Sequence, residues 1–393
     1  MGIFGALIIR DRNYRKEEEH IITITDYNHD VDSLQSYMKD VHGLYDGRAP
    51  FTPSKSIDGT EFDKFQFHSG LINGRGRFYD PETGDHNDSP LEVFNVYRGR
   101  FYRFRVIGAG SMLAFRISVD HHSILLVASD GHDLEPVKVE SFIINPGESF
   151  DFILVANQAV SNYWIRSHNL EIDRNHRTEA ILRYCGAPIV EPTTSRMTCS
   201  ASSRCLVANC PYLLYPPSHY TDCLTFNDMR GAPWNEPPPT FEEFRFEEYF
   251  LNFCMIDKHP SSVNGIVFNS PTVSLLLNPR KKFSLVITQL VERTECARAP
   301  TELILPMATW SDLSWLQGNL PGLKFERPPL KDTLIVPSGG YAVVRFRADN
   351  LGLWLMHCHM EVHHIEGMRL LLNESLPLVP SPPKGFPECR SFL

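Results

Sequence analysis

Short runs in which apolar and polar residues alternate recur along the chain. The run Tyr-Arg-Phe-Arg-Val at 102–106 places two arginines on one face and three apolar residues on the other, and Val-Arg-Phe-Arg-Ala at 344–348 does the same. Turns rich in Gly and Pro separate such runs, and no long amphipathic helix is evident. The pattern predicts an all-β protein.

Two parts of the chain resemble each other in the order of their predicted elements. Each part contains the beginning of a first strand. A Pro/Gly turn, an aromatic residue and a second strand follow, and then a third strand. The matched segments are 98–102 with 280–284, 144–154 with 335–346, and 163–166 with 353–356. Three matched elements in one order predict two domains of one fold, with a chance likeness between β-hairpins as the alternative.

These matches divide the chain into four predicted segments. Residues 1–15 precede the first copy, residues 16–185 form it, residues 186–225 form a linker rich in Cys and Pro, and residues 226–386 form the second copy. We expect chemistry in the second copy only, because Arg166-Ser-His-Asn follows the strand of the first copy where Met356-His-Cys-His follows that of the second.

Composition narrows the classes of function. The 393 residues are 42% hydrophobic, which is enough for sizeable cores, and the formal net charge is −9. A negative chain of this kind is not expected to bind nucleic acid or an anionic membrane surface. No apolar run approaches the length needed to span a bilayer.

The nine cysteines predict disulfides. Besides Cys358, eight remain, and three of them (Cys199, Cys205 and Cys210) lie close together in a stretch rich in Pro, Ser and Thr. This favours a disulfide framework in an oxidising, extracellular compartment over scattered reduced thiols. The first ten residues lack a basic region, so they do not predict a signal peptide.

A metal-ligating motif lies near the end of the second copy. It reads His357-Cys-His-Met-Glu-Val-His363-His-Ile-Glu-Gly-Met368. The thiolate of Cys358, an imidazole five residues later (His363) and a thioether five beyond that (Met368) are three of the four ligands of a blue-copper site. A zinc site is the alternative, although zinc clusters rarely include Met at ligand spacing.

His357 and His359 flank the cysteine. Because side chains alternate along a strand, we expect both imidazoles to point away from Cys358 toward a second metal site. Such an arrangement would join two copper sites through one cysteine.

These residues give the chain its resemblance to laccase-like multicopper oxidases, particularly the animal (insect-type) group. The motif at 357–368 carries the likeness, and further similar stretches lie at 4–8, 71–78, 90–94 and 332–337. The resemblance implies tandem cupredoxin domains, which are Greek-key β-sandwiches. It further implies that Cys358, His363 and Met368 hold a blue copper that accepts electrons from phenolic or similar substrates. His357 and His359 then belong to a copper cluster that reduces O₂ to water, so that Cys358, His357 and His359 are the catalytic residues.

The resemblance also implies ligands that this sequence lacks. The family uses four His-x-His pairs, whereas His357 and His359 form the one pair here, and no histidine occurs between His259 and His357. The segment 292–300 lies where the family's His-Pro-x-His-x-His-Gly motif is expected. We therefore expect an incomplete laccase chain, with residues 1–15 the remnant of a first domain and no four-electron O₂ reduction. A catalytically incompetent secreted cupredoxin pair is the alternative, and a zinc-binding structural module a third reading.

Other histidines have weaker claims. His364 could relay protons, although a supporting role is favoured, and His121 and His122 are expected to pack in a core or at its edge. His259 is a possible stray copper ligand.

Overall fold

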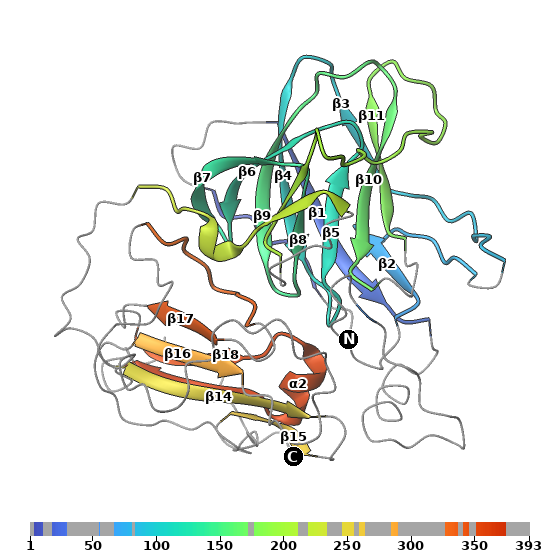
Figure 1. Cartoon of the computed structure of the whole chain (residues 1–393). Coiled ribbons are helices and arrows are strands. Elements are labelled where there is room, and N and C mark those ends of the chain that lie inside the picture. Colours follow the sequence, from blue (N-terminus) through green and yellow to red (C-terminus); the bar gives the residue numbers. More distant parts are fainter. Residues whose placement is uncertain are drawn as a thin grey trace, which may run out of the picture. The chain divides into compact units, whose positions relative to one another are not determined.

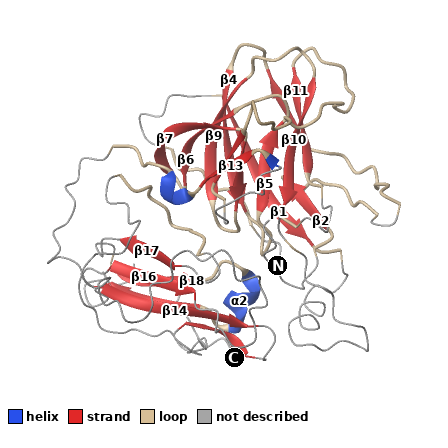
Figure 2. Cartoon of the chain, in the orientation of Figure 1, coloured by secondary structure: helices blue, strands red, loops and turns tan. Residues whose placement is uncertain are grey.

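The structure is a computed structural model whose regular secondary structure consists almost entirely of β-strands (Figure 2). It describes residues 4–10, 18–29, 55, 67–80, 83–171, 177–210, 219–233, 246–254, 259–263, 284–289, 327–336, 341–345 and 351–374. The predominance of strands among the described elements confirms the all-β prediction. Across these residues, no helix is long and apolar enough to cross a bilayer.

The chain forms two compact units, described separately below. Unit 1 consists of Met1–Trp234 and Lys324–Ile335, and unit 2 of Asn235–Leu323 and Val336–Leu393. The boundaries drawn from the sequence at residues 15, 185, 225 and 386 stay predictions.

One sheet of unit 1 has six strands in the order β2-β1-β4-β9-β6-β7 (Figure 1). Their bounds are β1 Glu19–Tyr27, β2 Ser69–Ile72, β4 Phe101–Gly108, β6 Ile124–Ser129, β7 His132–Val139 and β9 Ser149–Val155. Burial alternates along β4 as the sequence predicts, because Tyr102, Phe104 and Val106 are buried. Arg103 and Arg105, on the other face of β4, both pair with Asp151 of β9.

The second sheet of unit 1 has seven strands in the order β13-β12-β8-β5-β10-β11-β3. They are β3 Val93–Val96, β5 Phe115–Val119, β8 Ser141–Ile144, β10 Asn162–Asn169, β11 Glu179–Tyr184, β12 Cys205–Ala208 and β13 Thr221–Leu224, and a short 3-10 helix, η2, follows at Phe226–Asp228. Aromatic rings join the two sheets, since Phe142 of β8 lies 5.9 Å from Phe152 of β9 between ring centroids. Phe94 of β3 packs 5.7 Å from Phe104 of β4. Unit 1 is thus a β-sandwich with an aromatic core.

Unit 2 repeats part of this sheet order. Its four-stranded sheet runs β15-β14-β16-β17, with β14 Phe246–Cys254, β15 His259–Val263, β16 Ser284–Gln289 and β17 Tyr341–Arg345. β14 pairs with β15 antiparallel and with β16 parallel, and β16 pairs with β17 antiparallel. β1, β2, β4 and β9 of unit 1 have the same order and the same directions. The four strands therefore share one topology in the two units.

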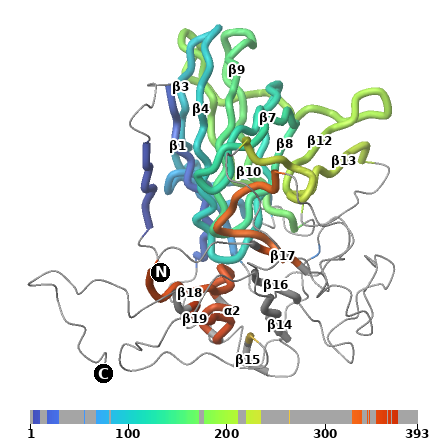
Figure 3. Tube along the Cα trace, turned by 90° about the vertical axis from the view of Figure 1, so that its left-hand side faces the viewer, coloured from blue at the N-terminus to red at the C-terminus, as the bar shows by residue number. Residues whose placement is uncertain are grey.

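An antiparallel pair completes the described part of unit 2. β18 (Gly352–His357) and β19 (Arg369–Glu374) pair along their whole length, and the helix α2 (Glu361–Glu366) lies in the connection between them (Figure 3). β18 and β19 correspond in direction to β10 and β11 of unit 1.

The segment predicted as a linker contributes structure to unit 1. β12 and β13 lie within 186–225 and extend the seven-stranded sheet, since β12 pairs in parallel with β8 and β13 pairs in parallel with β12. Two disulfides, Cys199–Cys205 and Cys210–Cys223, hold this segment. They confirm part of the predicted framework, whereas Cys185 forms no disulfide within the described residues. Cys296 and Cys389 lie outside the described residues.

A buried lysine holds the segment 327–335 within unit 1. The Nζ atom of Lys331 lies 2.9 Å from Glu148 Oε1 and 3.4 Å from Asp130 Oδ2, and all three side chains are buried. The same ammonium lies 4.6 Å from the ring centroid of Phe150 and 4.9 Å from that of Phe226. A charge buried in this way is tolerated because it is paired and hydrogen-bonded.

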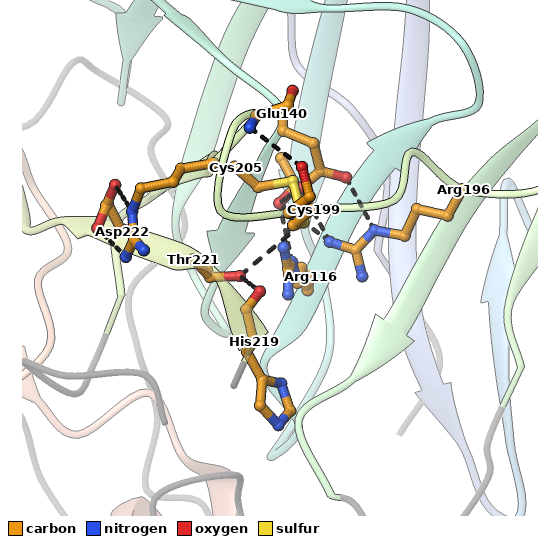
Figure 4. Close-up of a disulfide and its surroundings, with 12 residues drawn as sticks. Arg116, Glu140, Arg196, Cys199, Cys205, His219, Thr221 and Asp222 are labelled. Atoms are coloured by element: carbon orange, nitrogen blue, oxygen red, sulfur yellow. Dashed lines mark hydrogen bonds and ion pairs between the residues drawn. A yellow bond between two sulfur atoms is a disulfide. The ribbon is translucent and has the colours of Figure 1, made fainter. Parts of the chain in front are cut away.

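A second ion cluster lies beside the Cys199–Cys205 disulfide (Figure 4). The buried carboxylate of Glu140 accepts hydrogen bonds from Arg196 and Arg116 and from the hydroxyl of Ser141. Burial alone would raise the pKa of Glu140, but the two guanidinium groups and the hydroxyl outweigh it and lower the pKa to about 2.

We predict that Lys331→Met destabilises unit 1. Removing the ammonium leaves Asp130 and Glu148 as buried carboxylates without their cation, which costs about 3–5 kcal/mol. Urea unfolding followed by tryptophan fluorescence, to which the buried Trp164 of unit 1 contributes, measures this loss. Lys138→Met, at an exposed position of β7, serves as control and should change stability by less than about 0.5 kcal/mol. Equal effects of the two substitutions would contradict the prediction.

Glu140 should also give unit 1 a distinct dependence on pH. Its pKa in the folded chain lies below the ordinary value of 4.5, so its stabilisation is complete above pH 4.5 and is lost as the pH falls toward 2. Glu140→Gln should lower stability at neutral pH by about 3 kcal/mol and flatten the pH dependence in that window. Unfolding curves across this pH range, compared with those of the exposed Glu135→Gln, test it. An unchanged pH profile in Glu140→Gln would show that the carboxylate does not carry the effect.

Candidate metal centre

The candidate centre lies where β18 ends and β19 begins. Cys358 is the first residue after β18, and Met368 is the last residue before β19. The backbone N–H of Cys358 donates a 3.0 Å hydrogen bond to the carbonyl oxygen of Met368. The β18–β19 ladder thus continues up to the two residues and closes the loop that contains α2.

A left-handed glycine turns the chain back after α2. Gly367 has φ 116°, a conformation that favours glycine because it has no Cβ. Its N–H donates to the carbonyl of His364 (3.1 Å), and the N–H of Met368 donates to that of His363 (3.0 Å). The turn satisfies carbonyl groups at the end of the helix and returns Met368 to Cys358.

The loop brings two of the predicted ligands together. Cys358 Sγ lies 3.5 Å from His363 Nδ1. This separation suits a metal ion between them, since sulfur and nitrogen ligands of one tetrahedral ion lie about 3.5 Å apart at ordinary bond lengths. His363 is buried, and so is Met368, which is 3% exposed. The half-buried thiol of Cys358, with the buried imidazole and thioether, forms a soft donor set of the kind that copper accepts.

Burial sets the protonation states of the thiol and the imidazole. It raises the pKa of the Cys358 thiol to about 11, although the backbone N–H of Met360 opposes this shift. Burial lowers the pKa of His363 to about 4. At neutral pH both groups are therefore uncharged, so the imidazole can already ligate, and a metal ion must displace the proton of the thiol.

The two flanking histidines are exposed and lie near each other. The Nδ1–H of His357 donates a 2.9 Å hydrogen bond to the carbonyl oxygen of Cys358, which leaves Nε2 free to bind a metal. The rings of His357 and His359 lie 5.8 Å apart. β18 ends at His357, so the alternation expected from a strand does not extend to His359.

His364 and Arg369 lie near His357, a grouping that the sequence did not predict. The ring of His364 stacks on that of His357 with centroids 4.2 Å apart. Arg369 Nη1 lies 3.4 Å from His364 Nε2. The sequence holds no signal for this contact, because it depends on how α2 is placed against the start of β19.

The structure also describes His122 and His259, two further histidines named in the sequence analysis. His122 is buried as expected, with Nε2 2.7 Å from the hydroxyl of Tyr184 and Nδ1 2.7 Å from the carbonyl oxygen of Asp120. His259 begins β15, a strand that packs against α2. The segment 292–300 lies outside the described residues. Among the residues that the structure describes, no three His, Cys, Asp or Glu side chains form a metal-binding group.

Comparison with known sequences places the chain in a family. Models of the multicopper oxidase family match residues 18–187 and 309–376. Laccase-2 of Agaricus bisporus is 30% identical over 338 residues, covering 78% of this chain and 57% of that protein. Laccase-4 of Thanatephorus cucumeris is 29% identical and covers 99% of this chain and 70% of that protein. The chain belongs to the multicopper oxidase family and is laccase-like.

Solved structures confirm the fold. The laccase of Botrytis aclada superimposes with a TM-score of 0.60 at 19% identity, covering 93% of this chain and 65% of that chain. The expected tandem cupredoxin fold is therefore confirmed, and the family is one that uses copper. The chain spans a little over half the length of the Agaricus bisporus laccase. The animal subgroup suggested by the sequence stays a prediction, since the relatives named here are fungal.

We predict that Gly367→Ala weakens metal binding at this centre. A Cβ at φ 116° strains the turn that returns Met368 to Cys358, at a cost of about 1 kcal/mol, or roughly fivefold in affinity. Copper(I) affinity, measured by competition with a chromophoric chelator, tests this. Gly99→Ala introduces comparable strain at φ 88° in unit 1 and should leave the affinity unchanged. Wild-type affinity in Gly367→Ala would contradict the assigned role of the turn.

Proposed function

We propose that this chain is a laccase-type copper oxidoreductase that takes single electrons from phenolic or diphenolic substrates and passes them toward the reduction of O₂ to water. The observation that carries the proposal is the convergence of Cys358 Sγ and His363 Nδ1, with the buried Met368 returned to them by the loop. Membership of the multicopper oxidase family supports it.

Three residues are assigned to one blue-copper site. Cys358 supplies a thiolate, His363 its Nδ1 atom and Met368 its thioether. Copper bound there supplies one-electron chemistry, because it alternates between two oxidation states. The protein buries His363 and Met368, so water is kept from them, and the closed loop fixes their spacing.

His357 and His359 are assigned to a second copper site. The carbonyl of Cys358 holds His357 in the tautomer that leaves Nε2 available. Cys358 lies between these two histidines in the sequence, so the chain provides a short covalent route between the two sites.

A second candidate function is a catalytically incompetent copper-binding protein. It is favoured by one observation, that His357 and His359 are the one His-x-His pair in the sequence. Four-electron reduction of O₂ at a copper cluster requires more imidazoles than this pair provides. Both candidates are assigned to an extracellular setting, which the two disulfides support.

We expect the copper-loaded chain to show an intense visible band from thiolate-to-copper charge transfer. Cys358→Ser should abolish the band, because the hydroxyl does not replace the thiolate. His132→Ala, which removes an exposed imidazole on β7, should leave it unchanged. Absence of the band in the loaded wild-type chain would contradict the blue-copper assignment.

Copper content and O₂ uptake with a diphenol separate the two candidates. About four coppers per chain with O₂ uptake support a working oxidase. One copper with the band and no uptake supports the copper-binding protein. No bound copper counts against both.

A further inference from the structure

A buried histidine and a buried tyrosine of unit 1 form a hydrogen-bonded pair that the proposed copper chemistry does not use. His122 lies in the connection from β5 to β6, and Tyr184 is the last residue of β11. His122 Nε2 lies 2.7 Å from the hydroxyl oxygen of Tyr184. His122 is 3% exposed and Tyr184 is fully buried, so this hydrogen bond is shielded from water.

The neighbours of the pair fix the direction of the hydrogen bond. His122 Nδ1 lies 2.7 Å from the carbonyl oxygen of Asp120, which only accepts, so Nδ1 carries the proton of the neutral ring. Burial lowers the pKa of His122, which keeps the ring neutral at neutral pH. Nε2 is then the acceptor, and the Tyr184 hydroxyl donates to it. The backbone N–H of Gln158 donates to the same hydroxyl at 3.2 Å, in agreement with this direction.

This geometry suits oxidation of the phenol by one electron. A phenol that has lost an electron is a strong acid, and in a buried site its proton needs a base within hydrogen-bond reach. Nε2 of His122 is such a base. After Nε2 has taken the proton, the imidazolium still donates from Nδ1 to the carbonyl of Asp120. The proton therefore crosses one hydrogen bond, and no water has to enter the core.

A neighbouring tyrosine lacks such a base. The ring centroid of Tyr163 lies 5.4 Å from that of Tyr184 and 5.0 Å from that of His122. Tyr163 is also buried, but its hydroxyl donates to the backbone carbonyl of Ala159 at 2.9 Å. A carbonyl oxygen is too weak a base to hold the proton. Two adjacent buried phenols thus differ in the group that accepts their proton.

Aromatic rings connect the buried pair to the surface. The ring of His121 lies 5.8 Å from that of Tyr163, and His121 is exposed. An electron from Tyr184 can therefore reach an oxidant at the surface across these rings, without the oxidant entering the core.

We propose that Tyr184 and His122 form a redox-active pair, in which an aryloxyl radical at the surface of unit 1 oxidises Tyr184 by one electron. The O–H bond of Tyr184 breaks, its proton goes to His122 Nε2, and the electron reduces the aryloxyl radical to a phenolate, which takes a proton from water. A neutral tyrosyl radical and an imidazolium remain. The supply of aryloxyl radicals rests on the proposed function, which removes single electrons from phenols, whereas the chemistry of the pair does not depend on copper.

The test oxidises the metal-free full chain with a photogenerated tris(bipyridine)ruthenium(III) complex. Samples are frozen after the radicals of exposed tyrosines have decayed, and electron paramagnetic resonance measures the remaining tyrosyl radical. Tyr184→Phe should lose most of this signal, and the matched control Tyr163→Phe should keep it. His122→Gln keeps an oxygen that accepts from the Tyr184 hydroxyl but is not a base. It should slow radical formation, followed by transient absorption, at least about tenfold.

Deuterated solvent should slow radical formation in the wild-type chain, because the proton moves with the electron. An undiminished signal in Tyr184→Phe overturns the proposal, and so does an unchanged rate in His122→Gln. Equal rates in H₂O and D₂O overturn it as well, and this measurement does not depend on how the variants fold. The chain carries no copper here, so a failure leaves the proposed function standing, and a failure to bind copper leaves this result standing.

Discussion

The candidate centre depends on one backbone constraint, the hydrogen bond from Cys358 N–H to the carbonyl of Met368. It extends the β18–β19 ladder by one step beyond His357 and Arg369. His363 and Met368 lie near the thiol of Cys358 because this hydrogen bond closes the connection between β18 and β19. Of the predicted ligands, α2 contributes only His363, whose side chain lies near Cys358. Gly367 forms the turn that leads the chain from α2 back to Met368.

The same strand pair serves a different purpose in unit 1. Arg166, which matches Met356 in the order of elements, donates to both carboxylate oxygens of the buried Asp120 and pairs with Glu179. Ser167 beside it is fully buried. Where unit 2 has soft ligands, unit 1 has a polar network that ties neighbouring strands together. One topology therefore supports a structural ion cluster in one unit and the candidate metal centre in the other, because the residues after the strand differ.

Much of the fold could be predicted from the sequence because its signals are local. Alternation at 102–106 gave the buried face of β4, and the matched segments at 98–102 and 280–284 lie at the starts of β4 and β16. The segment 186–225, predicted as a linker from its Pro and Cys content, contains β12 and β13. The two strands within it are stabilised by pairing with a distant strand and by disulfides, neither of which spacing reveals.

The candidate site was predictable in residue type but not in geometry. Spacing indicated Cys358, His363 and Met368, because a loop that leaves a strand and returns to it brings such residues together. The stacking of His364 on His357 and the position of Arg369 depend on tertiary placement, which spacing does not encode. The assignment of all five residues as ligands remains a prediction.

The stability of the centre and its affinity for metal are coupled through the loop. The half-buried thiol of Cys358, with a pKa of about 11, and the buried imidazole of His363, with a pKa of about 4, are both uncharged at neutral pH. A cation bound between them reverses the cost of burying the thiolate, so the metal stabilises the same closed loop that the Cys358–Met368 hydrogen bond favours. Strain at Gly367 must then appear both as weaker binding and as a smaller gain in stability on binding. The two losses are equal in free energy by linkage, because the affinity sets the stability gained on binding. The affinity itself separates the two roles of the loop, since strain at Gly367 lowers it only if the loop positions the ligands and does not merely carry them.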